Sequence, residues 1–324
     1  MVLARHRRPR VQATEVQWPY ARRGARRRSH RCGRVGARTP LRGTPMTDAT
    51  IREMETIRLE THDHVATLVL NRPDRLNAFT VRMWDEMREL GRELVADPGG
   101  IRAMVVRGEG RAFSSGLDTS VFAEGGFDSI GDGAAPRHAD PKVNVILNAQ
   151  DAYNWLQEAP FVTIAAIRGF ALGAGLQTAL ACDIRVCARG AQLGLLEHRY
   201  GILPDLGGTQ RLPRIVGPGK AIELITTAAK IDADEAFRIG LVERLVGDEE
   251  LETAAHDLAD TIAAQPPLAV RGAKRAVHAA LDGRSVREGL VVEAEGQSVC
   301  MGSDDFREAI AAFIEGRPPQ YQGR

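Results

Sequence analysis

The stretch GFALGAGLQTALACDIR at residues 169–185 places a glycine-rich turn between an apolar run and a helical segment. The apolar run at 161–167 is typical of a buried strand, and a helix is predicted from about 173 to 181. Glycine lets the backbone approach a ligand closely, and the first amides of a helix lie at the positive end of its dipole. The turn is therefore a candidate site for a negatively charged oxygen.

A second turn of this kind, AFSSGLD at 112–118, follows a short predicted strand at 102–107. Two amide donors that converge from separate turns form an oxyanion hole, and each such donor stabilises a transition state by roughly 3 kcal/mol. Glycines also serve tight turns and close packing. Each turn taken singly fits that structural explanation as well.

The segment GAGLQTA at 173–179 also matches the dinucleotide-binding pattern G-x-G-x-x-A. That pattern needs an acidic residue at the end of the next strand, where it binds a ribose hydroxyl. The next predicted strand, 183–188, is instead followed by Arg189 and Gly190. The sequence therefore disfavours a nucleotide-dependent dehydrogenase.

Working outward from this stretch, strands alternate with helices up to about residue 206, and the chain is then almost wholly helical. A strand is predicted at 64–70, and an amphipathic helix follows from Thr80, a good N-cap residue, to Val95. Further helices are predicted at 145–157, 217–228, 233–239, 249–265, 267–281, 284–299 and 303–315. Residues 123–142 are expected to form a mobile surface segment. This order indicates an α/β core followed by a C-terminal helical region.

Charge is divided unevenly along the chain. Residues 1–45 contain 13 Arg and one acidic residue, whereas the remainder has 30 basic and 41 acidic residues. The arginine-rich segment has no sustained apolar period, so we expect it to be disordered. A transit peptide and a nucleic-acid- or membrane-binding arm are alternatives. We favour a dispensable tail upstream of a start at Met46, with neither nucleic acid nor membrane as a partner.

Several classes of protein are disfavoured by composition. The most apolar stretch, residues 161–176, is interrupted by Arg168, so no transmembrane helix is predicted. The first residues lack the apolar core of a signal peptide. The four cysteines are scattered without a metal-ligand spacing, so we expect reduced thiols, no metal site and a cytoplasmic protein; they are Cys32, Cys182, Cys187 and Cys300.

Four stretches, taken in order, resemble the enoyl-CoA hydratase/isomerase (crotonase) superfamily. They are NRPDRLNA at 71–78, FSSGLD at 113–118, the stretch at 169–185, and EHRYGILPDLGGTQRL at 197–212. The resemblance extends from about Ile57 to the C-terminus. It implies an α/β fold, a crotonase-like spiral of ββα repeats at 46–248, with a C-terminal helical region at 249–324 that builds a homotrimer or homohexamer. It also implies an acyl-CoA substrate and no cofactor, since coenzyme A is part of the substrate.

The same resemblance assigns roles to individual residues. The backbone amides of Leu117 and Ala174 correspond to the oxyanion hole. The residues that correspond to the CoA site are Arg75, Leu76, Ala78, Ser115, Asp118, Phe313 and Arg317. In the family, the last two contacts come from the same or from a neighbouring subunit. A basic residue suits the phosphates of CoA.

The acid/base residues depart from the hydratase pattern. Hydratases of the family use two glutamates, and this chain has Glu197 at the second position but Gln177 at the first. Glutamine exchanges no proton, although it can orient water or a thioester. Hydration by a pair of carboxylates is therefore not expected.

Asp205 follows Glu197 by eight residues, the spacing at which dienoyl-CoA isomerases of the superfamily place a catalytic aspartate. Two carboxylates at different depths along an acyl chain can remove a proton at one carbon and return one at another. Asp205 also precedes a helix start, so an N-cap is its alternative role. We therefore expect double-bond isomerisation; hydration of a 2-enoyl-CoA by Glu197, with Gln177 holding the water, and acyl-CoA binding without turnover stay open.

Overall fold

The computed structural model describes residues 49–122 and 135–324. The chain divides into two units, Met1–Pro45 and Met46–Arg324, and all the described residues belong to the second. The predicted tail at 1–45 lies outside the described residues, as does most of the predicted surface segment at 123–142. Within the described ranges, no helix combines the length and the apolar character that crossing a membrane requires.

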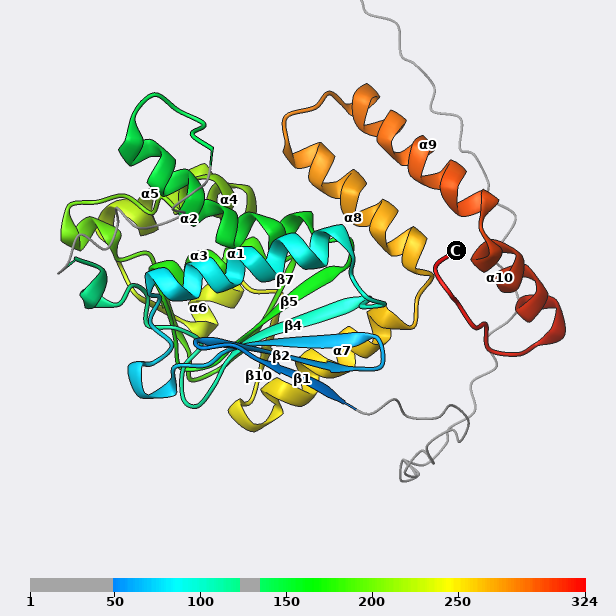
Figure 1. The fold of residues 1–324 in the computed structure, drawn as a ribbon, viewed down its shortest axis with the longest axis horizontal. Helices are drawn as coiled ribbons and strands as arrows, with labels where there is room; N and C mark the ends of the chain where they lie inside the picture. The colour runs from blue at the N-terminus through cyan, green and yellow to red at the C-terminus, as the bar shows by residue number, and fades with distance from the viewer. Residues whose placement is uncertain (1–48, 123–134) are drawn as a thin grey trace, which may run out of the picture. The chain divides into compact units, whose positions relative to one another are not determined.

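A seven-stranded sheet forms the centre of the second unit (Figure 1). Its order is β1 (Thr50–Glu53), β2 (Ile57–His62), β3 (Val65–Leu70), β4 (Ala103–Gly108), β5 (Val162–Ile167), β7 (Ile184–Ala188) and β10 (Arg244–Val246). β1, β2 and β3 pair antiparallel, and the strands from β3 to β10 pair parallel. The strands predicted at 64–70, 102–107, 161–167 and 183–188 are confirmed to within one residue at either end.

Helices cover both faces of the sheet, which explains why every residue of β3 is buried. Figure 1 shows α1 (Val81–Ala96), α2 (Pro141–Glu158) and α3 (Ala174–Ala181) on one side, and α7 (Leu251–Ala263) on the other. Alternate strand residues point to opposite layers. Leu68 and Met104 belong to the larger apolar cluster, whereas Val65 and Val105 pack with α7. The predicted boundary at 248 thus falls just before a helix that covers the sheet.

Most helices predicted from periodicity are confirmed. α1 begins after Thr80, whose Oγ1 accepts a hydrogen bond from the amide of Met83. The others are α5 (Pro218–Thr227), α6 (Ala233–Arg238), α8 (Pro267–Leu281), α9 (Val286–Gly302) and α10 (Asp304–Glu315). α2 begins at Pro141, four residues earlier than predicted, because Asp140 caps it.

Several short elements were not predicted. β6 (Phe170–Leu172), β8 (Gln192–Gly194) and β9 (Ile231–Asp232) form a second, three-stranded sheet. They have two or three residues each, too few to show a period. α4 (Gly208–Val216) begins with a glycine, follows another and contains Pro213, and these residues conceal its helical pattern.

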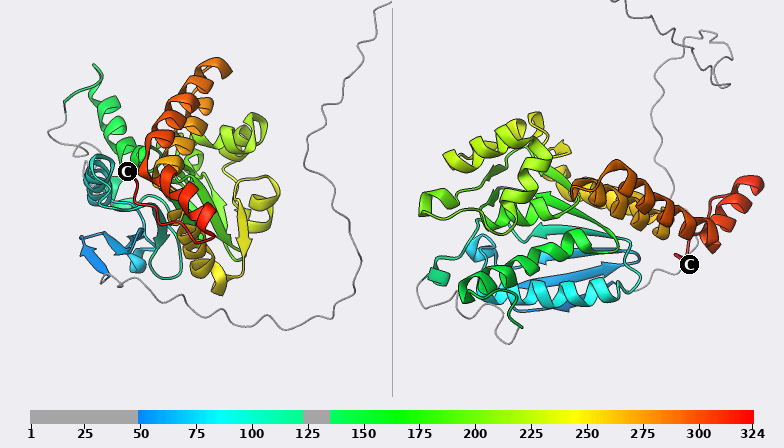
Figure 2. Two further views of the ribbon diagram at one scale, coloured as in Figure 1. Left: turned by 90° about the vertical axis from the view of Figure 1, so that its right-hand side faces the viewer. Right: turned by 90° about the horizontal axis from the view of Figure 1, so that it is seen from above.

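The last three helices extend from the sheet. α8 and α9 lie side by side, and α10 lies beyond their end in Figure 1 and in the right-hand view of Figure 2. Gly272 and Gly296 face each other between α8 and α9, since a Cβ added to either would lie within 3.7 Å of the other's Cα. These helices expose many large apolar side chains, among them Leu290, Val291, Val299, Met301, Phe306, Ile310, Phe313 and Ile314.

Candidate active site

The two glycine-rich turns lie side by side. The amide of Ser114 donates to the carbonyl of Phe170 at 2.8 Å, and the amide of Leu172 donates back to Ser114 at 3.0 Å. A Cβ added to Gly116 would lie only 3.8 Å from the Cα of Gly173. Both glycines have positive φ, 105° and 50° respectively, a region that favours glycine. Glycine therefore permits both the turns and their close approach.

The next amides along the two turns are those of Leu117 and Ala174. Leu117 pairs with Phe79 through neighbouring groups: the Phe79 amide donates to Gly116 at 2.7 Å, and the Asp118 amide donates to Phe79 at 2.8 Å. Ala174 is the first residue of α3, so its amide has no acceptor within the helix. Neither amide has an acceptor among the described residues, so both can bind a ligand oxygen.

Glu197 lies beside this pair of turns. A Cβ added to Gly173 would lie 3.2 Å from Glu197 Oε1. Only 9% of Glu197 is exposed, and its Oε2 has no hydrogen-bond partner in the described part of the chain. Burial raises the pKa of Glu197 and the charge of Asp205 adds to this, against a lowering hydrogen bond from Gln177. A buried carboxyl group with a free oxygen and a raised pKa has the properties of a general base.

Gln177 holds the Glu197 carboxyl group. Its Nε2 donates to Glu197 Oε1 at 2.8 Å, and its Oε1 accepts from the amide of Gly208 at 2.9 Å. Gly208 is the first residue of α4, so one buried side chain satisfies a helix N-terminus and orients the carboxyl group. The predicted role of Gln177 in orienting water or substrate stays a prediction, because its contacts here are with Glu197 and Gly208.

Asp205 lies in the turn that precedes α4. The N-cap of α4 is Gly207, so the alternative of Asp205 as a helix cap is wrong; the helix begins two residues later than that role requires. Burial raises the pKa of Asp205. Its charge acts on Glu197, and the charges of both carboxyl groups act on Tyr153. The structure thus places the two predicted carboxylates in one buried neighbourhood.

Tyr153 completes this neighbourhood and was not identified from the sequence. It is fully buried on α2, and its hydroxyl oxygen accepts a hydrogen bond from Trp84 Nε1 at 2.7 Å. Burial, together with the charges of Asp205 and Glu197, raises the pKa of Tyr153, so the hydroxyl stays neutral. A tyrosine on the buried face of an amphipathic helix resembles any core residue, and no sequence signal distinguishes it.

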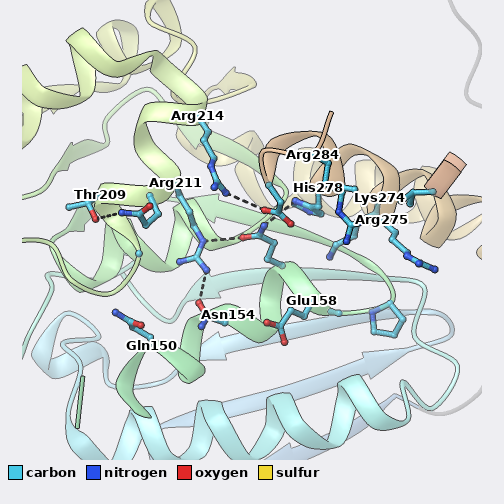
Figure 3. A pocket seen from close by; sticks show the side chains of 18 of the residues that line it. Gln150, Asn154, Glu158, Thr209, Arg211, Arg214, Lys274, Arg275, His278 and Arg284 are labelled. Carbon is cyan, nitrogen blue, oxygen red and sulfur yellow. Dashed lines mark hydrogen bonds and ion pairs between the residues drawn. The ribbon is translucent and has the colours of Figure 1, made fainter. Parts of the chain in front are cut away.

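Arg211 fixes the turn that carries Asp205. Its side chain donates to the carbonyl of Leu206 at 3.3 Å, to Asn154 Oδ1 at 2.8 Å and to Gln157 Oε1 at 3.2 Å (Figure 3). It therefore joins the turn before α4 to two side chains of α2. The sequence contained this arginine within a motif, but the motif does not show what it contacts.

Four of the predicted CoA-site residues gather at the edge of the turn at 112–118. The amide of Ser115 donates to the carbonyl of Leu76 at 2.9 Å, and its Oγ donates to the carbonyl of Arg75 at 3.5 Å. Ala78 belongs to the same turn, which Arg72 closes by donating to the Ala78 carbonyl. The segment 72–78 thus lies directly against the segment that supplies the Leu117 amide.

The carboxylate of Asp118 already has partners within the protein. Its carboxylate pairs with Arg72 at 2.9 Å and accepts from the amide of Ser120 at 3.0 Å. Burial alone would raise the pKa of Asp118, but these hydrogen bonds and the charge of Arg72 outweigh it and lower the pKa. In this structure Asp118 joins the two turns of the predicted CoA site.

The remaining two predicted CoA contacts lie elsewhere. Phe313 is 87% exposed on α10, and Arg317 pairs with Glu308 at 2.6 Å and with Glu315 at 2.5 Å. α10 lies on the far side of α8 and α9 from the sheet (Figure 1). Within one chain, these two residues are not brought to the turns at 72–78 and 113–118.

Cys182 and Cys187 are buried in the core, and both are free thiols. Burial raises the pKa of Cys182 and of Cys187 to about 12. Both thiols therefore stay protonated and unreactive at neutral pH.

Comparison with known proteins adds independent findings. Residues 60–324 match the family model of enoyl-CoA hydratase/isomerase. A short-chain-enoyl-CoA hydratase of Clostridium acetobutylicum is 36% identical over 266 residues, which cover 82% of this chain and 97% of the relative. A peroxisomal Delta(3,5)-Delta(2,4)-dienoyl-CoA isomerase of Arabidopsis thaliana is 32% identical over 277 residues, 85% of this chain and 99% of the relative.

A solved structure extends the similarity to the fold. A Thermobifida fusca protein described as an enoyl-CoA hydratase, in complex with CoA, superposes with a TM-score of 0.66 at 37% identity. The match covers 76% of this chain and 93% of that one.

Proposed function

Because the chain belongs to the enoyl-CoA hydratase/isomerase family and has the crotonase fold, we propose that it moves a double bond along the acyl chain of an acyl-CoA thioester. It is an enzyme of that family. The observation that supports isomerisation is the shared neighbourhood of Glu197, which is buried, and Asp205, which is partly buried; both have raised pKa values.

The first part of the proposed mechanism is stabilisation of an enolate. The thioester oxygen accepts hydrogen bonds from the amides of Leu117 and Ala174. Because these amides have no other acceptor in the described chain, they are preorganised for the negative charge that develops on that oxygen. By analogy with other oxyanion holes, each contributes roughly 3 kcal/mol in the transition state.

The second part is a pair of proton transfers. Ionised Glu197 removes a proton from one carbon of the acyl chain, and the electron pair moves into the conjugated enolate. Asp205, in its protonated form, returns a proton at another carbon. No electron leaves the substrate, so the proposed reaction needs no redox cofactor.

Hydration of a 2-enoyl-CoA is the second candidate, and the named hydratases among the relatives support it. In that reaction the free Oε2 of Glu197 takes the proton of an attacking water. Gln177 supplies no second carboxylate, so hydration would depend on Glu197 alone.

The decisive experiment is a mass-spectrometric assay with a panel of enoyl- and dienoyl-CoA thioesters. Water addition increases the product mass, whereas bond migration leaves it unchanged. Asp205→Asn is expected to lower isomerisation about 100-fold or more, the usual contribution of a general acid. Asp257→Asn, at an exposed position on α7, serves as the control.

Two results would contradict isomerisation as the main activity. One is a product that gains the mass of water from every substrate of the panel. The other is an equal loss of hydration and isomerisation in Asp205→Asn. Label exchange from heavy water next to the thioester separates either enzyme from a protein that binds acyl-CoA without turnover.

We further propose that the protein is a homotrimer or homohexamer in which α10 contributes to a neighbour's CoA site. The exposed apolar side chains of α9 and α10 form a surface of the kind that packs against another subunit. The distance of α10 from the turn at 72–78 favours contacts of Phe313 and Arg317 with a neighbouring chain.

A further inference from the structure

A cavity of about 760 Å³ lies next to the carboxyl groups and plays no part in the proton transfers proposed above. It lies between α2, α4 and the α8–α9 pair (Figure 3). Asp205 lines it, whereas Glu197 and the two oxyanion residues do not. Its volume falls in the range of small-molecule binding sites.

The cavity carries an excess of positive charge. Six basic residues line it against three acidic ones, Glu158, Asp205 and Asp282. The basic residues are Arg211, Arg214, Arg271, Lys274, Arg275 and Arg284. Asp282 pairs with Arg214 at 3.5 Å, and three acidic residues against six basic ones still leave an excess of positive charge in the lining.

Two of the basic side chains are held by contacts within the walls of the cavity. Arg211 is held by Leu206, Asn154 and Gln157 as described above, and Lys274 pairs with Asp183 at 2.8 Å. Lys274 also donates to two backbone carbonyls, of Leu156 and Phe161. These side chains have little capacity left for a ligand.

Of the other four basic residues, Arg275 pairs with Glu295 at 3.3 Å, and the remaining three are available to a ligand. Arg271 and Arg284 form no ion pair with any residue in 49–122 or 135–324, and Arg214 is held only by its long contact with Asp282. Figure 3 shows Arg214 reaching from α4 toward the side of the cavity formed by α8, where Arg284 and His278 lie. Guanidinium groups bind carboxylates through paired hydrogen bonds.

Asp205 connects the cavity to the candidate active site. Its carboxyl group is close enough to Glu197 and Tyr153 for its charge to affect both, and its backbone accepts from Gln150, another lining residue. Asp205 is thus the residue that the proposed proton transfers and the cavity lining have in common.

We infer that the cavity receives the far end of the acyl chain and selects acyl groups that end in a carboxylate. This inference rests on the proposed function and adds the substrate class to it. A single negative charge suits the site better than a phosphate group, because Glu158 and Asp282 line the same walls. A terminal methyl group would leave the arginines without a partner.

The test compares two saturated acyl-CoA esters of equal chain length, one ending in a carboxylate and one in a methyl group. Calorimetry is expected to show at least about tenfold tighter binding of the carboxylate ester, the effect of hydrogen bonds to a charged group. The double variant Arg214→Gln with Arg271→Gln should remove this preference and leave binding of the methyl ester unchanged. Arg92→Gln, at an exposed position on α1, is the control.

Turnover of the corresponding unsaturated esters separates this inference from the proposed function. Turnover without any preference for the carboxylate ester overturns the inference alone. An equal loss of binding affinity for both esters in the double variant does the same. A carboxylate preference in binding without turnover of any ester supports the inference and overturns the proposed function. Failure to bind either ester overturns both.

Discussion

Burial of the Glu197 carboxyl group lowers the stability of the fold but favours its action as a base. Its carboxyl group is buried with one oxygen unpartnered, which disfavours the ionised form and raises its pKa. A base with a raised pKa accepts a proton more readily. We therefore expect activity to fall as the pH decreases through the raised pKa, because the carboxylate is then protonated.

Glu197→Gln is expected to lower turnover by at least about 100-fold and to leave acyl-CoA affinity intact. It should also raise the melting temperature at pH 8. A carboxyl group whose folded-state pKa is raised destabilises the folded protein above that pKa, and this effect disappears below the ordinary carboxyl pKa. The gain should therefore vanish in acid, as followed by calorimetry from pH 8 to pH 4.

The control for this prediction is Glu89→Gln, which removes an exposed carboxylate from α1. It should change neither turnover nor the pH dependence of the melting temperature. A Glu197→Gln protein with normal turnover would contradict the role of Glu197 as the base.

Tyr153→Phe tests the buried hydroxyl between α1 and α2. The change leaves Trp84 Nε1 without its acceptor in the core, and an unsatisfied buried donor costs about 1–3 kcal/mol. Urea unfolding should show a loss of that size. Tyr200→Phe, at a residue that is 73% exposed, should show none; equal stability of both variants would mean that the Trp84 contact contributes nothing.

At the scale of elements, the start of α3 is the most constrained segment. Gly173 has φ of 50° and ψ of −120°, and a Cβ there would lie 3.2 Å from Glu197 Oε1. Gly173→Ala is therefore expected to shift either the Ala174 amide or the Glu197 carboxyl group. A displacement of about 1 Å can lower turnover about 100-fold.

Steady-state kinetics of Gly173→Ala check this prediction beside a matched glycine. Gly219 of α5 has open space around it and an ordinary φ, so Gly219→Ala should leave kcat unchanged. Full activity of Gly173→Ala would show that the junction tolerates a side chain.

α8 is attached to the sheet by a cluster of buried charged groups. Asp183 pairs with Lys274 and, at 2.9 Å, with His278. Burial alone would raise the pKa of Asp183, but these two partners outweigh it and lower the pKa. Asp183 thus stabilises the fold above the ordinary aspartate pKa, and this contribution is lost as the pH falls through the lowered value.

Lys274→Met is expected to destabilise the protein by about 3 kcal/mol, because it leaves Asp183 and two carbonyls with fewer partners in the core. The melting temperature at pH 7 and hydrogen exchange of α8 measure this effect. Lys220→Met is the control, because it removes a half-buried lysine of α5 whose only ion pair in the described chain is with Glu223 of the same helix. Unchanged protection of α8 would show that packing with α9 alone holds the helix.

Most of the long elements were predicted, but length alone did not decide this, since the six-residue β2 and the nine-residue α4 were missed. The helix after Thr80 and the strand at 64–70 have enough residues for a period to appear, and local propensity agrees with the fold. β6, β8 and β9 exist because the chain pairs with distant segments, such as Leu193 with Ile231. No local pattern contains that information.

At the scale of the whole molecule, α10 tests the proposed assembly. A chain with Phe313→Ala and Arg317→Ala keeps its own Glu197, and a Glu197→Gln chain keeps an intact α10. If α10 completes a neighbour's site, mixed oligomers of the two contain sites with both functional parts. We expect activity to return on mixing, after reversible dissociation, to a substantial fraction of the wild-type rate.

The outcome that contradicts this arrangement is equally clear. If α10 served the site of its own chain, no mixed oligomer would contain a complete site and mixing would restore nothing. Sedimentation of the mixture shows whether mixed oligomers have formed.

By itself, the sequence determined the glycines of the two turns, the carboxylates Glu197 and Asp205, and the order of the long elements. It could do so because backbone freedom, acidity and periodicity belong to residues and their near neighbours. Only the tertiary structure decided that Gln177 holds Glu197, that Tyr153 lies with the carboxyl groups, and that six basic side chains share one cavity. Those facts depend on contacts between segments far apart in the chain, and burial and charge act on a group only through such contacts.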